Sequence, residues 1–242
     1  MRHICIIPAR GGSKRIPRKN IKLFRGYPII KWSIEAALRS EAFESVIVST
    51  DDREIADVAA KYGAKIPLMR PKELSDDHSD TQSVINHMID QIDATRSKLD
   101  LVCCLYATAP FVEPEDLQKA VQLAKSSSDK TIFPVTRFSY PIQRALKRDI
   151  NGNTNFAISD ASEKRSQDLE EMYHDSGQYY IAEPKKWRNE KNILEDSKTI
   201  LLPSWKVQDI DNQEDWIRAE IMHEVLERYR RANWPAVPKE TW

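Results

Sequence analysis

Short apolar runs alternate with amphipathic segments through the first half of the chain, and this alternation constrains the fold more than any other feature. The runs with strand character are Ile4–Pro8, Ser45–Thr50, Ile66–Met69, Leu101–Tyr106 and Thr131–Val135. Between them, apolar residues recur at helical spacing, as at Ile30, Ile34 and Ala37. Strands that alternate with helices form a mostly parallel sheet with helices on both faces. The pattern therefore predicts an α/β fold that binds its ligand beyond the carboxyl ends of the strands.

The alternation stops near Arg137, and residues 137–181 are polar, with a hairpin-turn signal at Asn151-Gly152. We expect this segment to project from the sheet as a lid, a dimer contact, or both. A further strand at Thr199–Pro203, a short run at Val207–Asp211 and a final helix follow it. With 242 residues, the chain is expected to form one domain, residues 1–242, with this single insertion.

Composition excludes several classes of protein. Basic and acidic residues number 37 each, so the net charge is zero, whereas domains that bind nucleic acid are usually basic. The three cysteines, Cys5, Cys103 and Cys104, lie in apolar runs without the spacing of a disulfide framework or a zinc site. No run approaches the ~20 apolar residues of a membrane span. Because the chain enters a strand without a signal-peptide pattern, we expect a cytoplasmic protein with no membrane or nucleic-acid partner.

A basic, glycine-containing loop follows the first predicted strand. The first acidic residue of the chain is Glu35, and the loop reads Ala9-Arg10-Gly11-Gly12-Ser13-Lys14-Arg15-Ile16-Pro17-Arg18-Lys19-Asn20. Glycine N–H groups can approach phosphate oxygens closely, and Arg10, Lys14 and Lys19 would add positive charge. The chain contains neither G-x-x-x-x-G-K-[ST] nor G-x-G-x-x-G, so it is not a P-loop NTPase and has no dinucleotide fingerprint. The loop predicts phosphate binding; the alternative is a solvated basic loop.

Two carboxylates flank Ile210 near the start of the final helix. In an extended segment, Asp209 and Asp211 point to one side and Ile210 to the other. Two carboxylates combined with phosphate oxygens and waters suit Mg²⁺. The alternative is that Asp211 caps the helix. Capping is also the expected role of Asp51 and Asp52, which precede a predicted helix.

The segments described above resemble those of a known family. Residues 6–21, Ile-Ile-Pro-Ala-Arg-Gly-Gly-Ser-Lys-Arg-Ile-Pro-Arg-Lys-Asn-Ile, look like the signature of the CMP-sugar-acid synthetases, or acylneuraminate cytidylyltransferases. Further similar segments are Val48–Asp52 and Arg70-Pro71. Ala107–Phe111 falls where most relatives carry Gln-Pro-Thr-Ser-Pro, and Asp209–Asp211 falls at the late metal motif. Within the family, residues 165–170 and 173–180 are most similar to members that use pseudaminic acid. The likeness extends through most of the chain.

The resemblance implies a Rossmann-like fold and a defined reaction. CTP would bind over the basic loop, and the anomeric hydroxyl of a nine-carbon sugar acid would attack the α-phosphorus, with pyrophosphate leaving. The insertion would pair two subunits into a homodimer, and the partner's segment would help to close the sugar site. Legionaminic and N-acetylneuraminic acid are alternative sugars. A catalytically inactive nucleotide sensor is an alternative of another class.

The resemblance, together with the positions of the residues, also implies roles for individual side chains. The nucleotide site would comprise Ala9, Arg10, Gly11, Gly12, Ser13, Lys14, Asn20, Arg70, Thr81, Tyr106 and Thr108. Catalysis would use Arg10, Lys14, Lys19 and Asp211, the sugar would contact Arg165, Gln167, Asp175 and Tyr180, and Mg²⁺ would bind Asp209 and Asp211. Tyr106 stands where many relatives place a Gln against cytosine. Base selection could therefore use the tyrosine ring, its hydroxyl or backbone groups.

Overall fold

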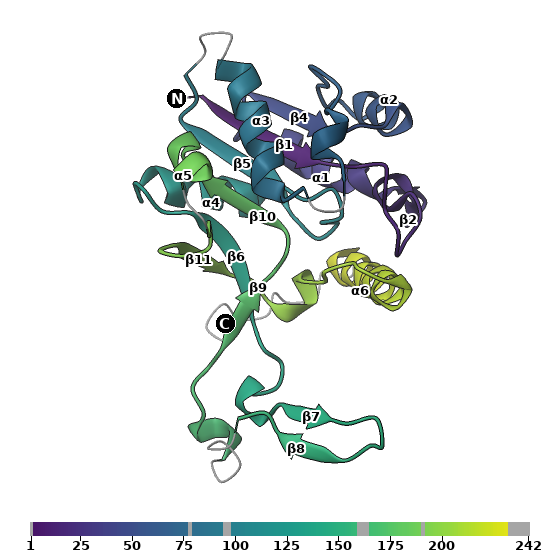
Figure 1. Cartoon of the computed structure of the whole chain (residues 1–242), viewed down its shortest axis with the longest axis vertical. Coiled ribbons are helices and arrows are strands. Elements are labelled where there is room, and N and C mark those ends of the chain that lie inside the picture. The colour runs from purple at the N-terminus through teal and green to yellow at the C-terminus, as the bar shows by residue number, and fades with distance from the viewer. Residues whose placement is uncertain (1, 77–78, 94–97, 159–164, 190–191, 232–242) are drawn as a thin grey trace.

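In the computed structural model, which describes residues 2–76, 79–93, 98–158, 165–189 and 192–231, a seven-stranded sheet forms the centre of the molecule (Figure 1). Its strands are β1 His3–Pro8, β4 Ser45–Ser49, β5 Leu101–Leu105, β6 Ile132–Arg137, β9 Tyr173–Asp175, β10 Tyr179–Ala182 and β11 Lys198–Leu201. The order is β11-β6-β10-β5-β1-β4, with β9 also paired to β6. β1 runs parallel to β4 and β5, and β11 parallel to β6, whereas β10 and β9 are antiparallel to their neighbours. The predicted mostly parallel α/β sheet is confirmed.

Helices cover both faces of this sheet. They are α1 Ile29–Arg39, α2 Arg53–Lys61, α3 Thr81–Asp93, α4 Pro114–Lys125 and α5 Pro184–Asn189, whereas the last helix, α6 Gln213–Arg231, packs in a separate cluster. Cys5 and Ile7 of β1 pack with α1, α2 and α4 on one face, while Ile4 and Ile6 pack with α3 and α5 on the other. Burial on both faces explains why the strands read as continuous apolar runs. None of the helices in the described residues has the length and apolarity that crossing a bilayer requires.

A third apolar cluster lies at one end of the sheet and holds α6 in place. It joins Ile16 of the basic loop, Phe24 of the short hairpin β2 Leu23–Phe24 and β3 Tyr27–Pro28, and Trp216 of α6. The Phe24 and Trp216 rings meet edge to face, with their centroids 5.7 Å apart. The Lys22 ammonium lies 4.6 Å from the centroid of the Trp216 ring. The final helix is thereby packed against the start of the chain.

The segment between β6 and β9 projects away from the sheet as an arm, which carries the hairpin β7 Leu146–Arg148 and β8 Thr154–Phe156 (Figure 1). The predicted turn is confirmed: Gly152 has a φ of +92°, and Asp149 Oδ1 accepts hydrogen bonds from the backbone N–H groups of Asn151 and Asn153 at 2.9 and 2.8 Å. The arm exposes large apolar side chains, among them Tyr140 at 84% and Ile150 at 96% exposure. Such a surface is typical of a protein contact.

Two expectations about the sheet are wrong. Residues Ile66–Met69 form no strand, because the ladder at Lys65 is a single bridge to Ile47 and Pro67 then supplies no N–H. The predicted insertion also ends earlier than residue 181, because β9 and β10 belong to the main sheet. β10 is a run of only four residues, so its place between β5 and β6 depends on tertiary contacts that local patterning does not reveal.

Replacing Trp216 with Ala is expected to lower the free energy of unfolding by about 3–5 kcal/mol, the usual cost of truncating a buried Trp. Trp216 is buried against Phe24, whereas its neighbour Ile217 is 50% exposed. Ile217→Ala is therefore the matched control and should change stability by about 0.5 kcal/mol or less. Denaturant unfolding of both variants measures the difference, and equal losses would contradict the packing described for α6.

Candidate active site

A cavity of about 550 Å³ opens at the carboxyl ends of β1 and β5. Its wall is formed by the basic loop, the segment after β5, the start of α3 and the loop before α6. The lining residues are Pro8, Arg10, Ser13, Lys14, Arg15, Lys19, Asn20, Arg70, Ser79, Thr81, Val84, Tyr106, Ala107, Thr108, Asp209 and Asp211. The position agrees with the general location of ligand sites in open α/β sheets.

The cavity wall carries an excess of positive charge. Five of its side chains are cationic and two are carboxylates. The cations are Arg10, Lys14, Arg15, Lys19 and Arg70, and the carboxylates are Asp209 and Asp211. Since the whole chain has zero net charge, this excess is local. A wall of this kind suits a ligand with several negative charges.

The basic loop is anchored to the end of β4 through its backbone. The N–H of Ala9 donates to the Ser49 carbonyl at 2.9 Å, and the N–H of Gly11 donates to Asp51 Oδ1 at 2.9 Å. Asn20 Nδ2 donates to the Arg10 carbonyl at 2.9 Å and so joins the end of the loop to its beginning. The N–H groups of Ala9 and Gly11 are thus engaged in hydrogen bonds within the protein. Neither they nor Gly12 lines the cavity, whereas Ser13 and the basic side chains do.

An ion-pair cluster fixes the base of the loop. The Arg18 guanidinium binds Asp52, with Nη2 to Oδ1 at 3.0 Å, and also binds Glu54 at 2.5 Å. Asp52 Oδ1 accepts from the N–H of Ile55 at 3.0 Å and caps α2, as the sequence predicts. The hydrogen bonds from Arg18 hold the pKa of Asp52 at about 2, well below its usual range. Asp51 anchors Gly11 instead of capping the helix.

Arg70 is a buried cation in the cavity wall. Its Nε donates to Ser49 Oγ at 3.1 Å, and its guanidinium also donates to the Ser49 carbonyl. Burial lowers the pKa of Arg70 to about 10, so the group stays charged at neutral pH. Among the described residues, no carboxylate lies within ion-pair distance of it. A buried cation with only neutral partners favours an anionic ligand.

The two carboxylates face the cavity because Ile210 between them is buried. Ile210 packs in the third apolar cluster, and its carbonyl accepts from Lys19 Nζ at 2.7 Å. Asp211 Oδ1 lies 2.9 Å from Arg15 Nη2 and 3.7 Å from Lys19 Nζ. Asp209 as a whole is solvent-exposed, but its carboxyl group is partly buried. This burial and the neighbouring Asp211 carboxylate raise the pKa of Asp209.

The alternative that Asp211 caps the final helix is wrong. Asn212 occupies the cap position, and its Oδ1 accepts from the N–H of Asp215 at 3.0 Å. Asp215 Oδ2 in turn accepts from the N–H groups of Asp211 and Asn212, each at 3.0 Å. This reciprocal pairing is a capping box. It leaves the Asp211 side chain available to the cavity.

Tyr106 and Thr81 lie together on the opposite wall. The two hydroxyl oxygens are 3.5 Å apart, and the Tyr106 ring meets the Tyr180 ring edge to face at 5.6 Å. Burial raises the pKa of Tyr106 to about 12, so its hydroxyl remains protonated and can donate. Thr108 lines the same wall.

The predicted sugar-site residues fall into two groups. Asp175 and Tyr180 lie beside Tyr106, and the Tyr180 hydroxyl donates to Asp175 Oδ2. Burial raises the pKa of Tyr180, so this hydroxyl keeps its proton. Arg165 is exposed, and Gln167 lines a separate cavity of about 490 Å³ at the root of the arm. A single subunit therefore does not bring these two side chains into the main cavity.

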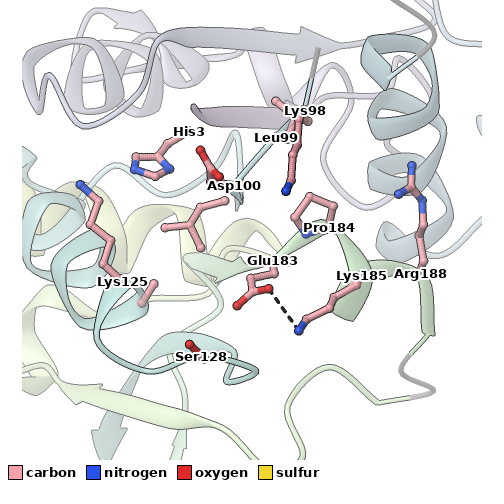
Figure 2. Close-up of a pocket in the computed structure, with 12 residues that line it drawn as sticks. His3, Lys98, Leu99, Asp100, Lys125, Ser128, Glu183, Pro184, Lys185 and Arg188 are labelled. Atoms are coloured by element: carbon pink, nitrogen blue, oxygen red, sulfur yellow. Dashed lines mark ion pairs between the residues drawn. The ribbon is translucent and has the colours of Figure 1, made fainter. Parts of the chain in front are cut away.

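Another cavity, of about 520 Å³, lies at the other ends of the strands and is the less suitable candidate for the active site (Figure 2). Several of its charged side chains are engaged by the protein itself. Lys185 Nζ lies 3.3 Å from Glu183, and Arg188 pairs with Asp90 at 2.8 Å. Asp100 accepts from the N–H of Arg2 at 2.5 Å. The cavity also lies at the amino ends of the parallel strands β1 and β5, away from the expected location of a ligand.

Sequence reasoning gave no role to some residues of the cavity wall. Arg15 belongs to the basic run, and only the structure reveals its ion pair with Asp211. Ser79 and Val84 flank the start of α3, where the N-terminus of a helix is a general signal for phosphate. The anchoring of Gly11 by Asp51 has no signal in the sequence beyond the presence of an acid after a strand.

Comparison with known proteins identifies similar chains. A family model described as "Cytidylyltransferase" matches residues 4–226. The chain is 44% identical over 226 residues to a pseudaminic acid cytidylyltransferase of Campylobacter jejuni, covering 93% of this chain and 97% of that protein. It is 35% identical over 233 residues to a CMP-N,N'-diacetyllegionaminic acid synthase of Legionella pneumophila, with the same two coverages.

A solved structure supports the fold. The CMP:2-keto-3-deoxy-manno-octonic acid synthetase complexed with CTP superposes with a TM-score of 0.69 and 15% sequence identity, covering 93% of this chain and 100% of that one. At this level of identity the likeness establishes the fold alone.

Replacing Gly11 with Ala is expected to disturb the basic loop, because the added Cβ would lie 2.8 Å from Asp52 Oδ2 and 3.1 Å from Asp52 Cβ. Overpacking of this kind costs about 1–3 kcal/mol. Gly12→Ala is the matched control, since its Cβ would meet nothing within 4 Å. Thermal unfolding of the two variants measures the difference. A Gly11→Ala protein as stable as Gly12→Ala would show that the loop does not depend on this close approach.

Proposed function

The chain belongs to the cytidylyltransferase family, and we propose that it transfers CMP from CTP to the anomeric hydroxyl of pseudaminic acid, releasing pyrophosphate. The observation that carries the proposal is the cavity at the carboxyl ends of β1 and β5, where five cations face two carboxylates. The 44% identity to a pseudaminic acid cytidylyltransferase over nearly the full length of both chains supports the choice of sugar.

The cationic wall would hold the triphosphate. Arg10, Lys14 and Lys19 come from one loop and Arg70 from the segment between α2 and α3, so two separate parts of the chain supply the cations. Their charge would offset that of the phosphate chain and favour the increase of charge on the leaving pyrophosphate. Tyr106 and Thr81 present hydroxyl groups, which could contact the cytosine or the ribose.

Asp209 and Asp211 fit a magnesium ion. Their carboxylates share one side of an extended loop, where burial and the neighbouring Asp211 carboxylate raise the pKa of Asp209. No group of three or more His, Cys, Asp or Glu side chains suited to a metal exists among the described residues, so two protein ligands would be completed by phosphate oxygens and waters. The bound ion would neutralise charge on the α-phosphoryl group and the pyrophosphate.

The proposed reaction is a displacement at phosphorus. The anomeric oxygen forms a bond to the α-phosphorus, the bond from that phosphorus to the α–β bridging oxygen breaks, and the hydroxyl proton is released. The protein's own side chains would orient the two substrates and offset the phosphate charge. Tyr106, which remains protonated, would act as a hydrogen-bond donor and not as a base.

The arm suggests that the enzyme works as a homodimer. Arg165 and Gln167 lie on the arm, outside the main cavity, and the arm exposes apolar side chains such as Tyr140 and Ile150. A second subunit would cover that surface and could bring the arm's polar residues to the sugar. Three buried free cysteines support a reducing, cytoplasmic location.

The first experiment measures pyrophosphate release with CTP and Mg²⁺, in parallel with pseudaminic, legionaminic and N-acetylneuraminic acids. Release with pseudaminic acid is the expected result. Release with legionaminic acid alone would move the assignment to the sugar named for the 35% identical relative. A shift of the melting temperature by CTP without release from any sugar would favour a nucleotide sensor, and the absence of both would contradict the family function.

Asp211→Asn should leave the fold intact and reduce turnover strongly, because one of two metal carboxylates is lost. Losses of 10-fold or more are typical of disrupted metal sites, where even residues behind the ligands cost about 10–100-fold. Glu214→Gln is the matched control, because its carboxylate is exposed and pairs with Arg218 on the same helix. Steady-state rates at saturating Mg²⁺ are compared, and an unchanged rate for Asp211→Asn would refute the metal assignment.

Lys14→Ala should raise the CTP concentration required for half-maximal rate, or lower turnover, by about tenfold, because a contact to a charged group contributes about 1.5–3 kcal/mol. Lys119 lies exposed on α4, far in sequence from the cavity-lining residues, and Lys119→Ala serves as the control. Initial rates across CTP concentrations give both parameters. Normal kinetics for Lys14→Ala would mean that this lysine does not contact the triphosphate.

A further inference from the structure

The turn between β9 and β10, residues 175–178, lies against the loop that carries Asp209 and Asp211. Gly177 adopts a left-handed conformation with φ +64°, and a Cβ built on it would lie 3.6 Å from Asp209 Cγ. Gln178 Nε2 donates to the Lys206 carbonyl at 2.5 Å. The turn is therefore hydrogen-bonded to the carboxylate loop through Gln178, and Gly177 lies beside Asp209 with room for about one methyl group between them.

Asp175 organises this turn from within. Its Oδ1 accepts from the N–H of Gly177 at 3.0 Å, and its Oδ2 accepts from the Tyr180 hydroxyl. Tyr180 is buried, and its ring packs against Tyr106 and Phe133 with centroids 5.6 and 5.9 Å apart. A rigid aromatic ring thus fixes the carboxylate, and the carboxylate fixes the backbone of Gly177.

The carboxylate loop is also held on either side of Asp209. The Lys206 ammonium binds Glu113 and lies 3.3 Å from Asp116 Oδ2, both near the start of α4. Ile210 is buried and its carbonyl is held by Lys19. Asp209 lies between these two fixed points, beside Gly177.

We propose that Tyr180 and Asp175 are positioning residues for Asp209, acting through the turn of residues 175–178, which Gln178 joins to the carboxylate loop. This inference rests on the proposed function, because it assigns Asp209 to Mg²⁺. It gives Asp175 and Tyr180 a task distinct from direct contact with the sugar. Residues that orient a metal ligand from behind usually affect metal affinity about 10–100-fold.

Tyr180→Phe tests the proposal, since it removes the hydroxyl that holds Asp175 and keeps the packed ring. The matched control is Tyr179→Phe. Tyr179 is the adjacent strand residue, it is also buried, and its hydroxyl donates to the Asp116 carbonyl at 3.4 Å on the other face of the sheet. Each variant loses one buried phenolic hydroxyl, so a general loss of stability would affect both.

The first readout is Mn²⁺ binding in the presence of CTP, followed by electron paramagnetic resonance of the free ion. We expect Tyr180→Phe to weaken Mn²⁺ binding roughly tenfold, and Tyr179→Phe to leave it unchanged. The second readout distinguishes an effect on metal binding from an effect on sugar binding. The Mg²⁺ concentration needed for half-maximal pyrophosphate release should rise in Tyr180→Phe, and saturating Mg²⁺ should restore turnover. The KM for the sugar should stay within about twofold of that of the unmodified chain.

A raised sugar KM with unchanged Mn²⁺ binding would overturn the proposal and return Tyr180 to the sugar site. Equal weakening of Mn²⁺ binding in both variants would also overturn it, since the effect would then be general. Gln178→Met is a second probe, because it removes the donor to Lys206 at similar side-chain length, and it should weaken Mn²⁺ binding in the same direction. If the unmodified chain released pyrophosphate with none of the tested sugars, the proposed function would fail. The Mn²⁺ titration would still decide the positioning role.

Discussion

The burial of Ile210 is the contact on which the cavity depends. Its side chain lies in an apolar cluster with Ile16, Phe24 and Trp216, which come from the basic loop, the first hairpin and the last helix. Because the neighbours of a buried residue in an extended segment point the other way, this one contact turns Asp209 and Asp211 toward the cavity. The same cluster sets the distance between the basic loop and the carboxylates, so packing and charge are fixed together.

Like charges crowd this region, and the protein offsets them through fixed partners. Arg18 forms ion pairs with Asp52 and Glu54 at the base of the loop. Arg15 and Lys19 form ion pairs with Asp211 at the cavity. Arg70 is held by neutral oxygen atoms of Ser49 and keeps its charge despite burial. Cations arranged in advance do not have to reorganise when an anion arrives, which is the general basis of electrostatic preorganisation.

The sequence predicted the layered sheet and the arm's hairpin, because these depend on local patterns. Strands buried on both faces read as apolar runs, and an Asn-Gly pair favours a hairpin turn. Arg70 and Tyr106 of the cavity wall were expected only through the family resemblance, since no local pattern joins them. Non-local features escaped prediction: the place of β10 between β5 and β6, the cap at Asn212 in place of Asp211, and the use of the Gly11 N–H by Asp51. The false strand at Ile66–Met69 looked apolar enough, but Pro67 ends its ladder.

The position of β10 has a consequence for the synthesis of the chain. In the sheet order, β10 separates β5, which belongs to the N-terminal group of strands, from β6 and β11. A nascent chain that has exposed only residues before 179 holds β4, β1 and β5 as one group and β6 with β9 as the other, with an open seam between them. Unpaired strand edges of this kind invite association with other chains. The sheet becomes continuous only when Tyr179–Ala182 has left the ribosome and entered that seam.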